Sequence, residues 1–140
     1  SRRRHTRCLS DWSSDVCSSD LGTPVHLLSG RLRATTLSAL GSRTVADIAG
    51  FRAQIVFLGA NGIDINLGFT TSDPEEASVK QAYIANAQES IVLADSTKFG
   101  SVFPAAFALP EKIDRIITDM QAPQNTIDSL VTHGVEVVLA

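Results

Sequence analysis

The sequence predicts an α/β fold built on a mostly parallel β-sheet. From residue 22 onward, short runs rich in β-forming residues alternate with segments of helical pattern, which is typical of this class. Residues 54–58 (QIVFL) and 90–94 (SIVLA) are continuous apolar runs, and such runs are typical of strands buried on both faces of a parallel sheet. Between these runs, Asp73-Pro74-Glu75-Glu76 is a strong helix-start signal.

The predicted elements follow one another closely along the chain. A first short strand is expected at residues 25–28, and a weaker extended segment at 31–36 follows the turn-like Ser29-Gly30. A short helix at 44–49 should end at Gly50. The remaining strands are expected at 54–58, 90–94, 115–118 and 135–139, and the remaining helices at 74–88 and 125–132. Asn61-Gly62 and Gly68 mark a loop of about a dozen residues.

Asp73 is the expected N-cap of the long helix. Pro74 would stand at its first position, and Glu76 three residues after the cap would complete a capping box.

Length and composition indicate one ordinary globular domain. The chain has 140 residues, of which 44% are hydrophobic and 19% charged. No apolar run approaches the roughly 18 residues that a membrane helix requires, so we expect no membrane span. The formal charge of −3 gives no electrostatic reason to expect nucleic-acid binding by this chain itself.

Residues 1–21 differ from the rest and have neither helical nor strand periodicity. They lack the apolar segment of a signal peptide, and their acidic residues are unlike a transit peptide. The run DWSSDVCSSDL (residues 11–21) reads as the translation of a common sequencing-library adapter, so we interpret residues 1–21 as non-native and disordered. Cys8 and Cys17 both fall there, so residues 22–140 carry no cysteine chemistry. On this interpretation the natural N-terminal part is missing.

Polar residues follow three of the predicted strands. Asn61, Asp95 and Asp119 come just after the strands at 54–58, 90–94 and 115–118. In open α/β sheets, ligands gather beyond the carboxyl ends of the strands, so these residues should share one rim with the start of the helix at 74–88. Asp95 and Lys98 could bind a phosphorylated polyol there, the carboxylate accepting hydroxyl protons and the ammonium attracting phosphate.

Structural roles are also open for each of these candidates. Asn61-Gly62 is a generic turn dipeptide, and Glu76 and Lys80 could form a solvent-facing ion pair one helical turn apart. Thr70 and Thr71 could bind a ligand or merely satisfy loop carbonyls. The histidines, His26 in a strand and His133 near a helix end, are expected to be structural.

Four segments in order resemble the sensor domain of DeoR-family transcriptional repressors. They are FLGANGID (residues 57–64), GFTTSDPEEASVKQAYIANA (68–87), VLADSTKFG (92–100) and IDRIITD (113–119). The resemblance extends from about residue 25 to the end. It implies a three-layer α/β domain similar to ribose-5-phosphate isomerase and glucosamine-6-phosphate deaminase, of which this chain is the C-terminal part.

The resemblance also implies a function. Such a domain binds a phosphorylated sugar or polyol, the effector, and the repressor then leaves its operator DNA. DNA would be bound only by a winged helix-turn-helix that this chain lacks, in a cytoplasmic, homo-oligomeric protein without a cofactor or metal. The expected effector-binding residues, aligned with the family's motifs or near them, are Asn61, Gly62, Asp64, Thr70, Glu76, Lys80, Asp95 and Lys98.

The alternative is a sugar-phosphate isomerase or deaminase of the same fold, because fold does not determine function. The isomerases carry a sequence resembling Asp-Gly-Ala-Asp-Glu where this chain has Gly59-Ala60-Asn61-Gly62. The loss of those acids argues against proton abstraction next to a carbonyl, and therefore against catalysis.

Overall fold

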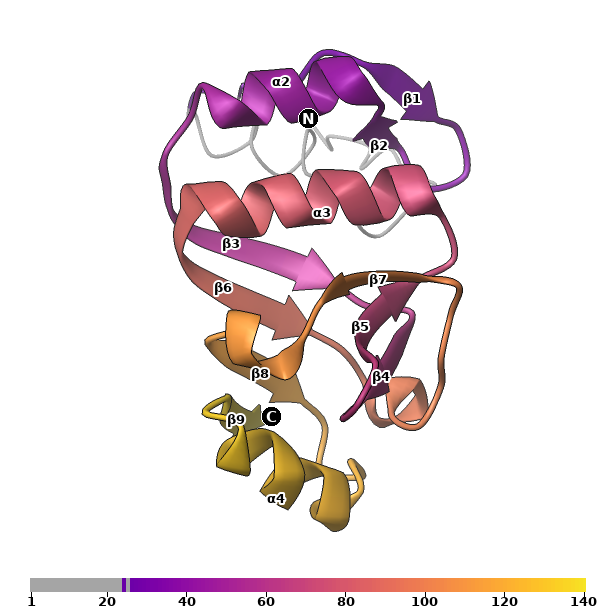
Figure 1. Ribbon diagram of the computed structural model, residues 1–140, viewed down its shortest axis with the longest axis vertical. Helices are drawn as coiled ribbons and strands as arrows, with labels where there is room; N and C mark the ends of the chain where they lie inside the picture. Colours follow the sequence, from indigo (N-terminus) through magenta and orange to yellow (C-terminus); the bar gives the residue numbers. More distant parts are fainter. Residues whose placement is uncertain (1–23, 25) are drawn as a thin grey trace, which may run out of the picture.

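The computed structural model describes Pro24 and residues 26–140, so the expectations for residues 1–21 lie outside the described residues. Its largest element is a four-stranded parallel sheet in the order β3-β6-β8-β9, shown in Figure 1. These strands are β3 (Ala53–Gly59), β6 (Ala87–Leu93), β8 (Arg115–Thr118) and β9 (Glu136–Leu139). All four were expected, and the mixed α/β class with a parallel sheet is confirmed.

A second, antiparallel sheet was not predicted. It has the order β4-β5-β7 and consists of β4 (Gly62–Asp64), β5 (Gly68–Thr71) and β7 (Ala105–Ala108). The segment from Asn61 to Gly68 was expected to be a loop, but it forms the β4–β5 hairpin instead. The Asp64 carboxylate accepts hydrogen bonds from the backbone N–H groups of Asn66 and Leu67, and these bonds close the turn of the hairpin. The many turn-forming residues of this segment favoured a loop prediction over a hairpin.

A third unit is the hairpin of β1 (Arg31–Arg33) and β2 (Ser38–Leu40), followed by helix α2 (Ser42–Ala49). The strand expected at 25–28 is wrong for residues 26–28, which are irregular, and Val25 lies outside the described residues. The extended segment expected at 31–36 turns after Arg33 and pairs with β2. Ser29 anchors this unit to α2: its N–H donates to the Asp47 carboxylate, and its carbonyl accepts from the Thr44 hydroxyl.

Helix α3 (Pro74–Asn86) begins as the sequence predicted. The Asp73 side chain accepts from the Glu75 N–H at 2.8 Å, and Pro74 is the first helical residue. The capping box is only half formed, because the Glu76 carboxylate contacts Arg33 and Lys80 instead of turning back to the cap. The helix ends at Asn86 rather than Gln88, because Ala87 is already extended and begins β6.

One face of the parallel sheet carries the core. Leu58, Val92 and Ile116 lie on it, in one cluster with residues of α3 and of α4 (Gln124–Thr132). Figure 1 shows α3 beside β3 and β6 and α4 at the other end, next to β9. No helix among the described residues is long and apolar enough to cross a membrane.

The other face of β3 is open to solvent. Ile55 and Phe57 alternate with the covered residues of the strand and are 46% and 59% exposed. The expectation that residues 54–58 are buried on both faces is therefore wrong. An apolar run cannot reveal whether a second layer packs on the other face of the sheet, and among the described residues Ile55 and Phe57 are left largely uncovered.

Candidate functional site

The register of the parallel sheet brings the three expected polar strand ends together. Gly59 of β3 pairs with Leu93 of β6, and Leu93 pairs with Ile117 of β8. Asn61, Asp95 and Asp119 each follow these paired residues by two positions and so lie along one rim. The rim contains a cavity of about 250 Å³, which we call the strand-end cavity. It is lined by Leu93, Ala94, Asp95, Ile117, Thr118, Asp119 and Ala140.

Two ionised carboxylates border the strand-end cavity. Asp119 accepts from the Ser96 N–H at 2.8 Å and from the Gln121 N–H at 2.8 Å, and these backbone hydrogen bonds lower the pKa of its carboxyl group. Asp95 accepts from both the hydroxyl and the N–H of Thr97, which lowers the pKa of Asp95. Both groups are therefore acceptors for hydroxyl protons at neutral pH.

Lys98 stands at the end of the short helix η1 (Ser96–Lys98), which Asp95 caps. Its backbone N–H donates to the Asp95 carbonyl at 3.1 Å, and its charge contributes to lowering the Asp95 pKa. Among the residues that the structure describes, no acceptor lies within hydrogen-bond distance of the Lys98 ammonium. Lys98 does not itself line the strand-end cavity, but it follows the lining residue Asp95 by three positions. Within the described part of the chain, this partly exposed cation can receive an anion without breaking an existing pair.

Other expected site residues hold the β4–β5 hairpin in place. The buried Thr70 hydroxyl donates to the Gly62 carbonyl at 3.2 Å and accepts from the Phe103 N–H at 3.1 Å. Thr71 donates to the Asn61 side chain at 2.9 Å. None of Asn61, Gly62, Asp64 and Thr70 lines the strand-end cavity, and their contact with an effector stays a prediction.

Glu76 and Lys80 form the expected ion pair at 2.7 Å, but the pair is not solvent-facing. Their side chains are 19% and 12% exposed. The Lys80 ammonium also donates to the Gly59 carbonyl at 2.8 Å and lies 4.9 Å from the centre of the Phe107 ring. Lys80 thus ties α3 to the end of β3, and this burial follows from the neighbouring β7, which was not predicted.

A second cavity of about 370 Å³, here called the hairpin cavity, lies between the β1–β2 hairpin, β3 and α3. Glu76 and Lys80 line it together with Leu37 to Leu40 of the hairpin and Phe57 to Gly59 of β3. Because Gly59 pairs with Leu93, just before Asp95, the two cavities lie at neighbouring strand ends. The structure therefore places Glu76 and Lys80 in one cavity and Asp95 in the next.

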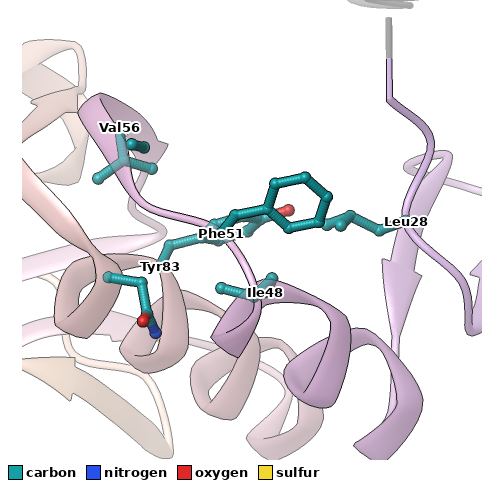
Figure 2. A pocket seen from close by; sticks show the side chains of 7 residues that line it. Leu28, Ile48, Phe51, Val56 and Tyr83 are labelled. Atoms are coloured by element: carbon teal, nitrogen blue, oxygen red, sulfur yellow. The ribbon is translucent and has the colours of Figure 1, made fainter.

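A third cavity of about 100 Å³ is almost wholly apolar. Figure 2 shows it between α2, α3 and the start of β3, with Leu28, Ile48, Phe51, Val56 and Tyr83 around it. Burial there raises the pKa of Tyr83. A cavity with so few polar groups does not suit a phosphorylated ligand.

Neither described histidine has the environment of a catalytic group or metal ligand. His26 is exposed and lies in an irregular segment rather than a strand. Its ring is tilted against the Phe51 ring, with 5.8 Å between the ring centres. His133 is the C-cap of α4, where its ring contacts the Ser129 carbonyl at 2.8 Å. Within the described residues, no group of three or more acidic, histidine or cysteine side chains could hold a metal ion.

Comparison with known proteins identifies the family. The family model described as "DeoR C terminal sensor domain" matches residues 15–120 of the chain. The chain belongs to this family. The matched region contains the strand ends of β3, β6 and β8, and it begins within the segment that we interpret as non-native.

Curated relatives of the chain are regulators of transcription. The chain is 40% identical over 83 residues to the uncharacterized HTH-type transcriptional regulator FruR of Bacillus subtilis (strain 168), covering 59% of this chain and 33% of that protein. It is 31% identical to the HTH-type transcriptional repressor GlcR of the same strain, covering 90% and 48% of the two chains. It is 27% identical to the glycerol-3-phosphate regulon repressor of Escherichia coli (strain K12), covering 82% and 46%.

The names of these relatives describe regulators and not enzymes, so the sensor-domain prediction is confirmed over the enzyme alternative. The chain spans less than half of the length of each of these relatives.

Two charged residues near the cavities were not among the expected effector-binding residues. Asp119 was placed on the rim but not assigned to the ligand, although its position after a buried strand matched that of Asp95. Arg33 contacts Asp73 and Glu76, which lie 40 and 43 residues further along the chain. No local sequence pattern could have revealed contacts at this separation.

Proposed function

We propose that this chain is the effector-binding part of a longer DeoR-family repressor of carbohydrate catabolism, and that its effector is a phosphorylated sugar or polyol. The matched family is a sensor domain, and one relative is named for a glycerol-3-phosphate regulon. In this proposal a winged helix-turn-helix outside this chain binds the operator, and the effector releases it. The complete protein is proposed to be cytoplasmic and homo-oligomeric.

The observation that carries the proposal is the Lys98 ammonium, which has no acceptor among the described residues and whose charge acts on Asp95 at the strand-end cavity. A phosphate group needs a cation that is not already neutralised, and Lys98 meets this condition whereas Lys80 does not. Asp95 and Asp119 offer acceptors to the hydroxyl groups of the same ligand. An unphosphorylated sugar would leave Lys98 without an anion.

We also propose that the complete domain has three layers, like ribose-5-phosphate isomerase. The open face of β3 supports this, because Ile55 and Phe57 expose apolar surface where a further layer would pack.

A ligand screen on the full-length repressor tests the function. Glycerol 3-phosphate, fructose 6-phosphate and glucose 6-phosphate are compared with glycerol, fructose and glucose by thermal shift and by release of operator DNA. We expect a phosphorylated compound to raise the Tm and release DNA, while its free form does neither. The proposal would be contradicted if the repressor responded equally to a phosphorylated compound and its free form. It would also be contradicted if the repressor responded to none of the six compounds.

The same assay on variants tests the assignment of Lys98. Lys98→Ala should bind the phosphorylated ligand about 10- to 100-fold more weakly, because a charge-assisted hydrogen bond is worth roughly 1.5–3 kcal/mol. Lys112→Ala is the control, since Lys112 is an exposed lysine, and the lysine whose charge acts on the Asp95 carboxyl group is Lys98. Normal induction of the Lys98→Ala repressor would remove Lys98 from the site.

A further inference from the structure

A chain of ion pairs connects the β1–β2 hairpin to the end of β3. Arg33 on β1 contacts the carboxylates of both Asp73 and Glu76, the latter at 3.3 Å. Glu76 in turn contacts Lys80 at 2.7 Å, and Lys80 donates to the Gly59 carbonyl. Three segments far apart in sequence thus share one charged network.

This network is more buried than the neighbouring ion pair on the same hairpin. The side chains of Arg33 and Glu76 are 27% and 19% exposed, whereas Arg31 and Glu75, which pair beside them, are 66% and 52% exposed. Exposed pairs contribute little because water screens them, while partly buried pairs hold their geometry more firmly. Arg33 therefore helps to hold the Glu76 carboxylate in place, together with Lys80.

The Glu76 carboxylate is divided between two cations. Its Oε2 atom faces Arg33 and its Oε1 atom faces Lys80, so Arg33 holds one oxygen while the other orients the ammonium. Each carboxylate oxygen can accept a second hydrogen bond, which leaves acceptor capacity toward the hairpin cavity that Glu76 lines. Lys80 is already neutralised, so this cavity favours neutral hydroxyl groups over a second phosphate.

We propose that Arg33 is a positioning residue of the effector site, which holds Glu76 and Lys80 in place to bind the hydroxyl groups of the effector. This inference rests on the proposed function, and it assigns different parts of the effector to different residues. Lys98 binds the phosphate, and the Glu76–Lys80 pair in the hairpin cavity binds the hydroxyl groups of the polyol chain. The β1–β2 hairpin, which supplies Arg33 and one wall of the cavity, becomes part of the sensor.

Calorimetric titration of the full-length repressor tests the inference. The ligand is the tightest-binding compound among glycerol 3-phosphate, fructose 6-phosphate and glucose 6-phosphate, and inorganic phosphate is measured as its competitor. In Arg33→Ala we expect the Kd of the organic phosphate to rise about 10-fold or more, because a charge-assisted contact to Glu76 is lost. The inhibition constant of inorganic phosphate should stay within about twofold, because Lys98 is untouched.

Arg31→Ala is the matched control, since it removes the exposed pair from the same strand, and its Kd should equal that of the wild type. Arg33→Lys should give an intermediate Kd, because one ammonium cannot hold two carboxylates as a guanidinium does. If Arg33→Ala does not fold, an Arg33→Lys variant with wild-type affinity overturns the inference.

The two proposals fail differently. If the wild type binds none of the three organic phosphates, the proposed function fails and this inference fails with it. If the wild type binds one of them but Arg33→Ala binds it equally well, only the role of Arg33 is overturned. An equal loss of affinity for organic and inorganic phosphate would also overturn that role, because it would indicate general damage to the site.

Discussion

A side chain at position 62 would collide with the chain segment that follows η1. A Cβ atom there would lie 2.2 Å from the Ser101 carbonyl oxygen and 2.8 Å from the Thr70 hydroxyl. Gly62 is thus required by close packing between β4 and its neighbours, whatever its role toward the effector. The Thr70 hydroxyl in the same contact already has two hydrogen-bond partners.

Gly62→Ala should lower the free energy of unfolding by about 1–3 kcal/mol, the usual cost of overpacking a close contact. Thermal melting of the sensor domain measures this. Gly59→Ala is the control, because nothing lies within 4 Å of the position of its Cβ. Equal melting temperatures for the two variants would show that a Cβ at position 62 does not crowd Ser101 and Thr70.

Helix α3 is the element that both the hairpin cavity and the core depend on. Its N-terminus receives the Asp73 cap and the contacts from Arg33, and its middle supplies Lys80 to the end of β3. Ala77, on its buried face, belongs to the main core cluster. Any change that loosens its first turn should therefore reach the hairpin cavity.

Asp73→Ala should destabilise the domain by about 0.5–2 kcal/mol, because the Glu75 N–H loses its acceptor at the helix start. Asp73→Ser keeps a capping oxygen and should recover most of the loss in a thermal melt. Equal melting temperatures for the alanine and serine variants would show that the cap itself contributes nothing.

At the scale of the whole molecule, the β3 edge of the parallel sheet is the feature that most favours self-association. No strand of the described residues pairs with the outer side of β3, and its exposed Ile55 and Phe57 side chains add apolar surface. The 140-residue chain by itself should therefore self-associate and be poorly soluble.

Phe57→Lys should shift the isolated chain toward monomer in sedimentation velocity, because a charge on an edge strand opposes pairing. Val131→Lys is the control: Val131 is 55% exposed, but it lies on helix α4 and not on a strand. A wild-type chain that is monomeric and melts cooperatively would contradict this account.

Local signals determined much of what the sequence could predict. The apolar runs gave β3, β6, β8 and β9, and Asp73-Pro74 gave the start of α3, because strand burial and helix capping depend on neighbouring residues. The rim of polar strand ends followed from the parallel order. Strands β4, β5 and β7 were missed because their pairing is set by partners elsewhere in the chain.

The sequence by itself determined the family, the parallel sheet and the residue types at its carboxyl edge. Only the tertiary structure decided which of those residues are already engaged: Lys80 is neutralised by Glu76, Thr70 is satisfied within the hairpin, and Lys98 has no described partner. It also brought Arg33 to Glu76. The physical reason is that a motif specifies which charges are present, whereas the cost of burying them depends on partners that only the folded chain brings within reach.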